Sequence, residues 1–298
     1  MSIVDFSFTE IKEKIKINHN FWTKELGIVR TLIAVSTFLT LIFNSSETLF
    51  LTGLENELFL LQDKVDYINI YTWFNSFLYG KIFSIIVLFF VILGLNPRVT
   101  CVFHWLVTYS FTITSTCTDG GDQVASIITL LLIPICILDT RSSHWKSQKN
   151  KFNYYKNNFA FVFTFLILLQ IFAIYFFAST GKFQSEVWQN GTALYYYSTL
   201  PQMGLSKGVI FDFFNFIIKS PIILTLSTWG ILILELFIAI GIFIENKILR
   251  KYIYFLGLLL HIFIILFYGI LSFSLTMIAC LFFAYKYNPV RKYEEKFS

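Results

Sequence analysis

A single lysine, Lys182, ends a long apolar run and opens a polar and aromatic stretch that reaches Ala193. An amine at the edge of a bilayer either extends its charge to the lipid headgroups or lies in a partly dry pocket, where it can act as a base. Glu186, Trp188, Thr192 and Tyr195 follow it closely. We therefore predict a pocket at the membrane edge, with Lys182 as base or positioning cation and these four residues around it.

Two aspartates stand in the turn Asp119-Gly-Gly-Asp122, directly before another apolar run. Either carboxylate could cap a helix by accepting hydrogen bonds from first-turn amides, and the glycines would permit the tight turn. The same carboxylates are expected at the membrane level of Lys182, where an anion would set its protonation. We predict Asp119 and Asp122 as partners of Lys182 in catalysis, with helix capping as the alternative.

Four further polar side chains interrupt the apolar runs, where each needs a partner. Arg30, His104 and Glu235 fall in the inner half of the predicted spans. The economical arrangement is a structural ion pair between Arg30 and Glu235, with His104 nearby. His261 lies near the middle of its run, where it could hydrogen-bond a neighbouring helix or a bound ligand.

The elements that position these residues are membrane helices. With 56% hydrophobic and 14% charged residues, the chain cannot cover a soluble surface with polar groups. We expect an all-α, polytopic helix bundle with about eight transmembrane helices, and an interfacial or re-entrant segment near 207–219. One membrane domain is predicted, with a cytoplasmic amphipathic arm (1–25), the bundle (26–286) and a cytoplasmic tail (287–298). The apolar stretches are 27–43, 78–95, 99–116, 123–138, 158–178, 221–244, 252–268 and 271–286.

The distribution of basic residues sets the expected orientation. If the N-terminus is cytoplasmic, 17 of the 23 Lys and Arg residues fall in the arm, the tail and the loops on that side. Both termini are then cytoplasmic in a bacterial inner membrane, and Lys182 lies outside. The net charge of +5 follows from this topology and indicates no nucleic-acid partner.

Several classes of site lack their motifs. No cluster of Cys and His has metal-ligand spacing, so no metal is predicted. No Gly-rich phosphate loop and no Gly-x-Ser-x-Gly motif is present. Cys117 is the one cysteine expected near the outer face, which leaves no external pair for a disulfide.

Several of these motifs together resemble a known family. They are Asp119-Gly-Gly-Asp122-Gln, Asp139-x5-Trp145, Lys182-x5-Trp188-x2-Gly191-Thr-Ala193, Glu235 and His261. Over roughly residues 25–286 the chain resembles the HTTM membrane domain, and within it the SdpB-type proteins that mature a secreted antimicrobial peptide. This resemblance implies an exported peptide precursor as substrate and a small accessory protein as partner.

A more distant resemblance reaches the membrane domain of the vitamin K-dependent gamma-glutamyl carboxylase. Its Tyr-Phe-x-Ala-x3-Lys segment is similar to Tyr175–Lys182, and the resemblance implies that the lysine is a base on the external side. The chain lacks the carboxylase histidine near Asp122 and its large luminal domain. The cofactor therefore stays open, with a quinone, a quinol or a lipid as candidates. A quinol-dependent, carboxylase-like enzyme is one alternative function. A peptide or lipid transporter, or an immunity-type binding protein without covalent chemistry, is the other.

Overall fold

A computed structural model describes residues 20–50, 66–74, 76–146, 153–199 and 209–287. Helices dominate these residues, and their β-structure is limited to the isolated bridge between Leu95 and Ser143. The predicted all-α class is therefore confirmed. The predicted arm and tail lie almost wholly outside the described residues, so the domain boundaries stay predictions.

Eight long helices coincide with the eight predicted apolar stretches. They are α2 (Lys24–Phe43), α5 (Phe77–Ile92), α6 (Pro97–Thr114), α7 (Gly120–Ile137), α8 (Tyr154–Lys182), α12 (Pro221–Gly241), α13 (Lys247–Tyr268) and α14 (Leu271–Lys286). Shorter elements are α3 (Ser46–Leu49), η1 (Asp66–Ile68), η2 (Ile70–Thr72), α9 (Glu186–Gln189), α10 (Ala193–Thr199) and α11 (Val209–Lys219). The last of these matches the segment expected to be interfacial or re-entrant.

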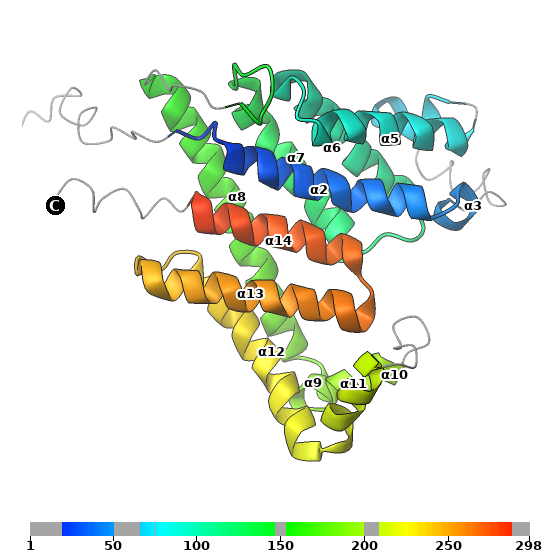
Figure 1. Ribbon diagram of the computed structural model, residues 1–298, viewed down its shortest axis with the longest axis vertical. Coiled ribbons are helices and arrows are strands. Elements are labelled where there is room, and N and C mark those ends of the chain that lie inside the picture. The colour runs from blue at the N-terminus through cyan, green and yellow to red at the C-terminus, as the bar shows by residue number, and fades with distance from the viewer. Residues whose placement is uncertain (1–19, 51–65, 75, 147–152, 200–208, 288–298) are drawn as a thin grey trace, which may run out of the picture.

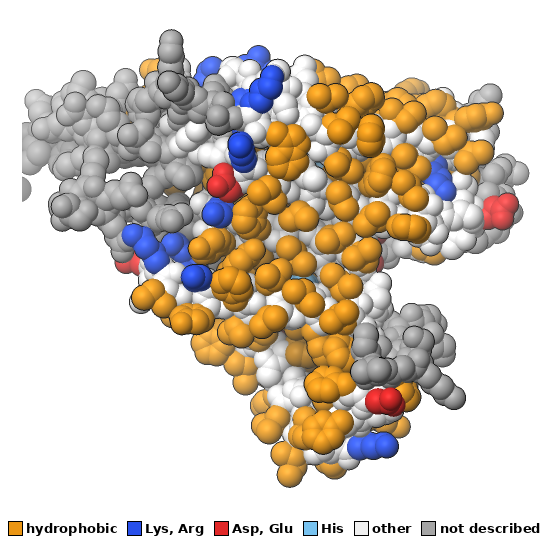
Figure 2. All heavy atoms as spheres, in the orientation of Figure 1, with side chains coloured by type: hydrophobic (Ala, Val, Ile, Leu, Met, Phe, Trp, Pro, Cys, Tyr) orange, Lys and Arg blue, Asp and Glu red, His pale blue; other side chains and the backbone are white. Residues whose placement is uncertain are grey.

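Among the residues that the structure describes, five helices are long and apolar enough to cross a membrane: α2, α7, α8, α12 and α13. α5 and α14 are apolar but have 16 residues each, about 24 Å at 1.5 Å per residue, against a hydrocarbon core of about 30 Å. A total of eight spans therefore stays a prediction. In Figure 2 hydrophobic side chains cover much of the visible face of the bundle, while most of the Lys and Arg side chains in view gather toward one edge. The apolar helices and this surface are consistent with a multi-pass membrane protein.

α14 packs beside α2 in the opposite direction. Ser36 on α2 donates to the Ser272 carbonyl near the start of α14 at 2.8 Å, and Thr23 before α2 hydrogen-bonds Tyr287 after α14 at 2.7 Å. Figure 1 shows the two helices side by side, with α13 next to α14. A tight turn at Gly269, whose φ of +68° favours glycine, joins α13 to α14.

α8 and α12 cross the other helices obliquely (Figure 1). α8 has 29 residues and is about 43 Å long, of which the apolar stretch 158–178 accounts for about 32 Å, close to the thickness of a hydrocarbon core. α12 runs antiparallel to α8, since Ser179 near the end of α8 donates to the Leu232 carbonyl at 2.9 Å and Phe183 contacts Trp229. The segment α9–α11 lies where these two helices converge.

Candidate functional site

A cavity of about 230 Å³ lies beside the end of α8. Helices α8, α9, α10, α12 and α13 and the first turn of α14 enclose it, and its walls are mostly apolar or aromatic. The lining residues are Lys182, Trp188, Leu194, Tyr197, Ile231, Glu235, Leu260, Phe263, Ile264, Tyr268, Ile270 and Phe273. Lys182, which the sequence places at the centre of a pocket, therefore does line one.

Lys182 and Glu235 form an ion pair in the cavity wall. The Lys182 side chain is 27% exposed and that of Glu235 is 10% exposed, so both charges are partly desolvated. The Lys182 ammonium also lies 5.2 Å from the centroid of the Trp188 ring, within cation–π distance. The second carboxylate oxygen of Glu235 is buried and has no hydrogen-bond partner among the described residues.

The antiparallel packing of α8 and α12 explains why these two side chains meet. Every Cα–Cβ bond in a helix tilts toward the helix N-terminus. Lys182 therefore leans back along α8 into the bundle. Glu235 leans toward the start of α12, which is the end of α12 that lies beside the end of α8. Glu235 lies six residues, or about 9 Å, beyond Trp229, and the long lysine side chain covers this offset. Lys182 consequently points inward, away from the end of its helix where headgroups would lie.

His261 stands behind one wall of the cavity and does not line it. Its Nε2 hydrogen-bonds the Tyr175 hydroxyl at 2.7 Å, and its ring centroid is 5.6 Å from that of the lining residue Phe273. Nδ1 is buried without a partner among the described residues. The structure therefore supports the hydrogen bond to a neighbouring helix that we expected as one option for His261.

The other residues predicted around the pocket divide into two groups. Trp188 lines the cavity, as expected. Glu186 and Tyr195 are exposed and are not among its lining residues. Thr192 donates to the Val187 carbonyl at 3.2 Å and so closes the turn between α9 and α10. Tyr197, one helical turn from Ala193, supplies the aromatic wall that Tyr195 does not.

Asp119 and Asp122 form a capping box at the start of α7. One Asp119 oxygen accepts from the Gly121 and Asp122 amides at 2.7 and 3.1 Å, and Asp122 accepts from the Asp119 amide at 3.1 Å. Neither residue lines the cavity. The capping alternative is therefore what the structure shows, and the carboxylate paired with Lys182 is Glu235. The second Asp119 oxygen accepts from Ser272 on α14.

The predicted ion pair between Arg30 and Glu235 is wrong. Arg30 is buried and instead contacts the Nδ1 atom of His144 at 3.2 Å and the Thr100 hydroxyl at 3.0 Å. The pairing was predicted only because both residues were expected at the same depth in the membrane. In the structure α12 packs on α8 and α13, so Glu235 faces Lys182 on α8. His104 is also buried, and its Nε2 has no hydrogen-bond partner among the described residues.

His144 is the centre of this second group of polar residues, which the sequence reading missed. Its ring occupies the space left by two glycines, since a Cβ on Gly27 or Gly94 would lie 2.8 or 2.5 Å from the ring. Arg141 pairs with Asp139 at 2.8 Å and donates to the His144 carbonyl at 2.9 Å. Burial, followed by the Arg30 and Arg141 charges, lowers the pKa of His144 to about 3. The available signal was the spacing Asp139-x5-Trp145, which encloses His144.

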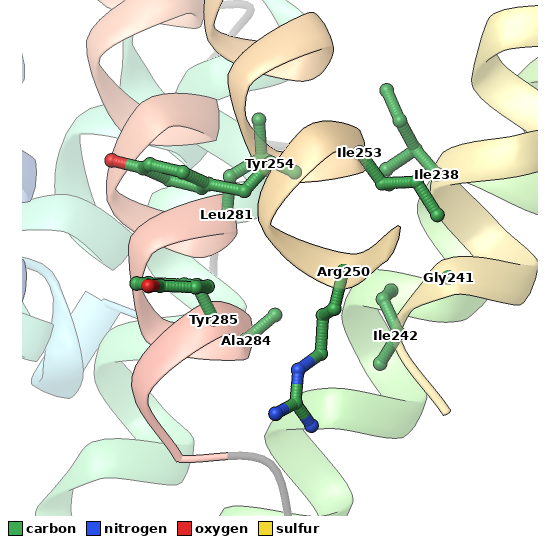
Figure 3. A pocket seen from close by; sticks show the side chains of 9 residues that line it. All are labelled: Ile238, Gly241, Ile242, Arg250, Ile253, Tyr254, Leu281, Ala284 and Tyr285. Atoms are coloured by element: carbon green, nitrogen blue, oxygen red, sulfur yellow. The ribbon is translucent and has the colours of Figure 1, made fainter. Parts of the chain in front are cut away.

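Another recess lies among α12, α13 and α14, at the opposite end of α13 from the cavity. Figure 3 shows Arg250 between Ala284 and Ile242, with Tyr254 and Tyr285 on the same side of it as Ala284. Its volume of about 20 Å³ is little more than a water molecule needs. Within the described part of the chain, no three His, Cys, Asp or Glu residues are placed to hold a metal ion.

Comparison with known proteins places two curated relatives beside this chain. It is 33% identical over 274 residues to the sporulation-delaying protein SdpB of Bacillus subtilis (strain 168), covering 88% of this chain and 81% of the relative. It is 30% identical over 271 residues to the uncharacterized protein YitO of the same organism, covering 87% and 84%. No family model matches the chain. No solved structure matches it either.

Proposed function

This chain belongs to the family of the sporulation-delaying protein SdpB, and we propose on that premise that it acts in the maturation of an exported, antimicrobial-type peptide precursor. The proposal places the reaction in the cavity that contains Lys182. It also places the protein in a bacterial cytoplasmic membrane, with eight spans, both termini in the cytoplasm and the cavity on the external side. A small accessory protein is the expected partner.

The observation that carries the proposal is the Lys182–Glu235 pair in the wall of an open apolar cavity. Two charges removed from water cost several kcal/mol each, and a well-packed apolar pair is often at least as stable. A charge pair in the wall of a cavity therefore favours a functional role over a purely structural one. Perturbed or desolvated charges in clefts are common at catalytic sites.

We assign each residue of the pair a definite part. Glu235 holds the Lys182 ammonium at the wall and can take one of its protons. The neutral amine can then accept a proton from a substrate group in the cavity, and the proton on Glu235 is released when the pair re-forms. If Lys182 stays protonated, it holds a substrate carbonyl instead. Trp188 keeps the amine in place through its ring face.

The size of the cavity limits what enters it. Pockets for drug-sized ligands measure about 300–1,000 Å³, and this cavity measures about 230 Å³. It can therefore take a single apolar or aromatic side chain of a peptide, with its adjoining peptide group near Lys182. Most of the precursor would stay outside the cavity, along the surface formed by α9–α11.

A quinol-dependent reaction is a second candidate, favoured by the aromatic walls. Trp188, Tyr197, Phe263, Tyr268 and Phe273 offer faces on which an apolar ring could stack. A quinol would supply an oxidisable hydroxyl to the reaction, and Lys182 is the residue placed to take its proton. Extraction of purified protein, followed by chromatography for quinones and lipids, tests this candidate. A stoichiometric lipid without quinone would contradict it.

Mass spectrometry of the exported peptide tests the main proposal. We expect cells with the intact protein to export the mature peptide, and cells with Lys182→Arg or Lys182→Met to export or retain only the precursor. Guanidinium cannot act as a base because it stays protonated. Lys219→Arg is the matched control, since Lys219 is an exposed lysine at the end of α11.

The results separate the alternatives. Normal maturation in both Lys182 variants would refute the proposal. Normal maturation in Lys182→Arg alone would leave a positioning charge. Chemically unchanged peptide whose movement across the membrane depends on the protein would identify a transporter. If the exported peptide is the same with and without the protein, but the protein protects the producing cell from that peptide, it is an immunity-type protein.

A further inference from the structure

We infer that the turn Asp119–Asp122 is a positioning device that fixes one wall of the cavity through the first turn of α14. The inference rests on the proposed function, because it assigns the turn a part in keeping Lys182 and its cavity in their working geometry. It replaces the expectation that the two aspartates act on Lys182 directly.

The contacts run in an unbroken series from the turn to the cavity. Asp119 uses one oxygen to cap α7 and the other to accept from the Ser272 hydroxyl. The residue after Ser272 is Phe273, which lines the cavity and contacts the ring of His261. A single carboxylate therefore links the start of α7 to a residue in the cavity wall.

Gly121 makes the second link, which depends on the absence of a side chain. A Cβ at this position would overlap the Phe273 Cα and lie 2.8 Å from the Phe273 nitrogen. The backbones of α7 and α14 thus approach each other as closely as glycine allows. At Gly120, in contrast, a Cβ would come no closer than 3.7 Å to the Phe273 ring, an ordinary contact.

The first turn of α14 is also held from its other side, by hydrogen bonds to α2. The Ser272 carbonyl accepts from Ser36 at 2.8 Å, and Thr276 donates to the Ser36 hydroxyl at 3.1 Å. Ser272 is therefore fixed through both its side chain and its backbone, by two different helices. With α14 held against α2 and α7, Phe273 has one defined distance from α13 and the cavity.

The two glycines provide a matched pair of variants. In a helix, alanine is more favourable than glycine by about 1 kcal/mol, so Gly120→Ala should be acceptable for α7 itself. A Cβ on Gly121 would also lie 2.9 Å from the Asp119 oxygen that caps α7, so Gly121→Ala disturbs the cap as well as Phe273. If the glycines serve only the turn, neither variant moves the cavity wall. If Gly121 positions Phe273, only Gly121→Ala pushes the first turn of α14 away from α7 and toward the cavity.

Reductive methylation of Lys182, followed by mass spectrometry, reports on the cavity without depending on peptide maturation. In purified full-length protein treated with formaldehyde and a borane reductant, we expect Gly121→Ala to slow Lys182 methylation several-fold and to abolish maturation. Gly120→Ala should change neither. The exposed Lys146 in another loop serves as the internal standard for reagent activity.

A second pair of variants decides the question if Gly121→Ala fails to fold. Ser272→Ala removes the hydroxyl that binds Asp119, and we expect it to raise the Lys182 methylation rate several-fold because the wall is less constrained. Ser274→Ala is its control, since Ser274 is buried on the same helix and its hydroxyl has no partner among the described residues.

An unchanged Lys182 rate in Ser272→Ala would overturn the inference, as would equal effects of the two glycine variants. A changed rate with normal maturation would support the positioning contact but refute the proposed role of the cavity.

Discussion

Two groups of buried charges lie toward opposite ends of the bundle, and their surroundings differ. Arg30, Arg141, Asp139 and His144 are buried, and glycines are placed where the imidazole ring needs room. Lys182 and Glu235 contact each other and the Trp188 ring in the wall of a cavity. The comparison teaches that burial alone does not mark a functional charge. Space beside the charge is the more informative feature.

The largest expected effect is all-or-none and tests whether the two groups face opposite sides of the membrane. In a Cys117→Ser background, a membrane-impermeant maleimide on intact cells should label Asn190→Cys and leave Ser143→Cys unlabelled until the membrane is permeabilised. Asn190 follows α9 near the cavity, and Ser143 precedes His144. Labelling of Ser143→Cys in intact cells would reverse the orientation and place Lys182 in the cytoplasm.

The packed group should be the more sensitive to added volume. Gly94 has φ of +77°, and an added Cβ would lie 2.5 Å from the His144 ring. We expect Gly94→Ala to lower the free energy of unfolding by about 3 kcal/mol, from backbone strain and overpacking together. Gly181→Ala is the control, because no atom lies within 4 Å of its Cβ position. Equal stability of the two variants in denaturant titrations would mean that the His144 site tolerates expansion.

The effects of substitutions at Lys182 and Glu235 on stability should be coupled, whereas those at Arg30 and Glu235 should be independent. Removing one partner leaves a charge unpaired, so Lys182→Met and Glu235→Met should each cost about 2 kcal/mol, less than the roughly 3–5 kcal/mol of a fully buried pair. The double variant should cost less than the sum. Arg30→Met with Glu235→Met should be additive within about 0.5 kcal/mol. Coupling of Glu235 to Arg30, instead of to Lys182, would contradict the pairing described above.

Per pH unit, the smallest effect is a pH dependence of stability that arises at His144. The native protein keeps this imidazole neutral down to a pH of about 3, whereas in the unfolded chain it binds a proton below its ordinary pKa of 6.5. Stability should therefore fall as the pH is lowered from 6.5 toward 3, with a contribution of at most about 1.4 kcal/mol per pH unit. The difference between the intact protein and His144→Gln isolates this contribution. Identical slopes for both proteins would show that His144 accepts a proton without unfolding.

Much of the fold and the centre of the site could be predicted from the sequence. Apolar periodicity and length locate the eight long helices, because each must bury or face lipid with most of its surface. The position of Lys182 before a Trp-containing stretch also directs attention to the region where the cavity lies, although the role of the cavity stays a prediction. These signals are local, since they depend on residues within one or two helices.

The partners of the charged residues could not be predicted in the same way. Assigning depth by counting residues treats all helices as parallel, whereas α8 crosses the others obliquely (Figure 1) and its lysine covers an offset of about 9 Å along α12 to Glu235. The pairing of Arg30 with His144 depends on a loop that folds under α2. The capping role of Asp119 was visible as an alternative, but its bond to Ser272 joins residues 153 positions apart.

The pairing of α2 with α14 has a consequence for biosynthesis. The ribosome makes α14 after every other described helix, yet Ser36 on α2 and Thr23 before it hydrogen-bond Ser272, Thr276 and Tyr287 at the two ends of α14. Until α14 inserts, Ser36 and Thr23 lack these partners, and the Asp119 cap lacks Ser272. A chain interrupted before α14 therefore leaves polar groups of α2 and α7 without the partners they have in the finished protein, the kind of feature by which quality-control proteases distinguish unfinished proteins from complete ones.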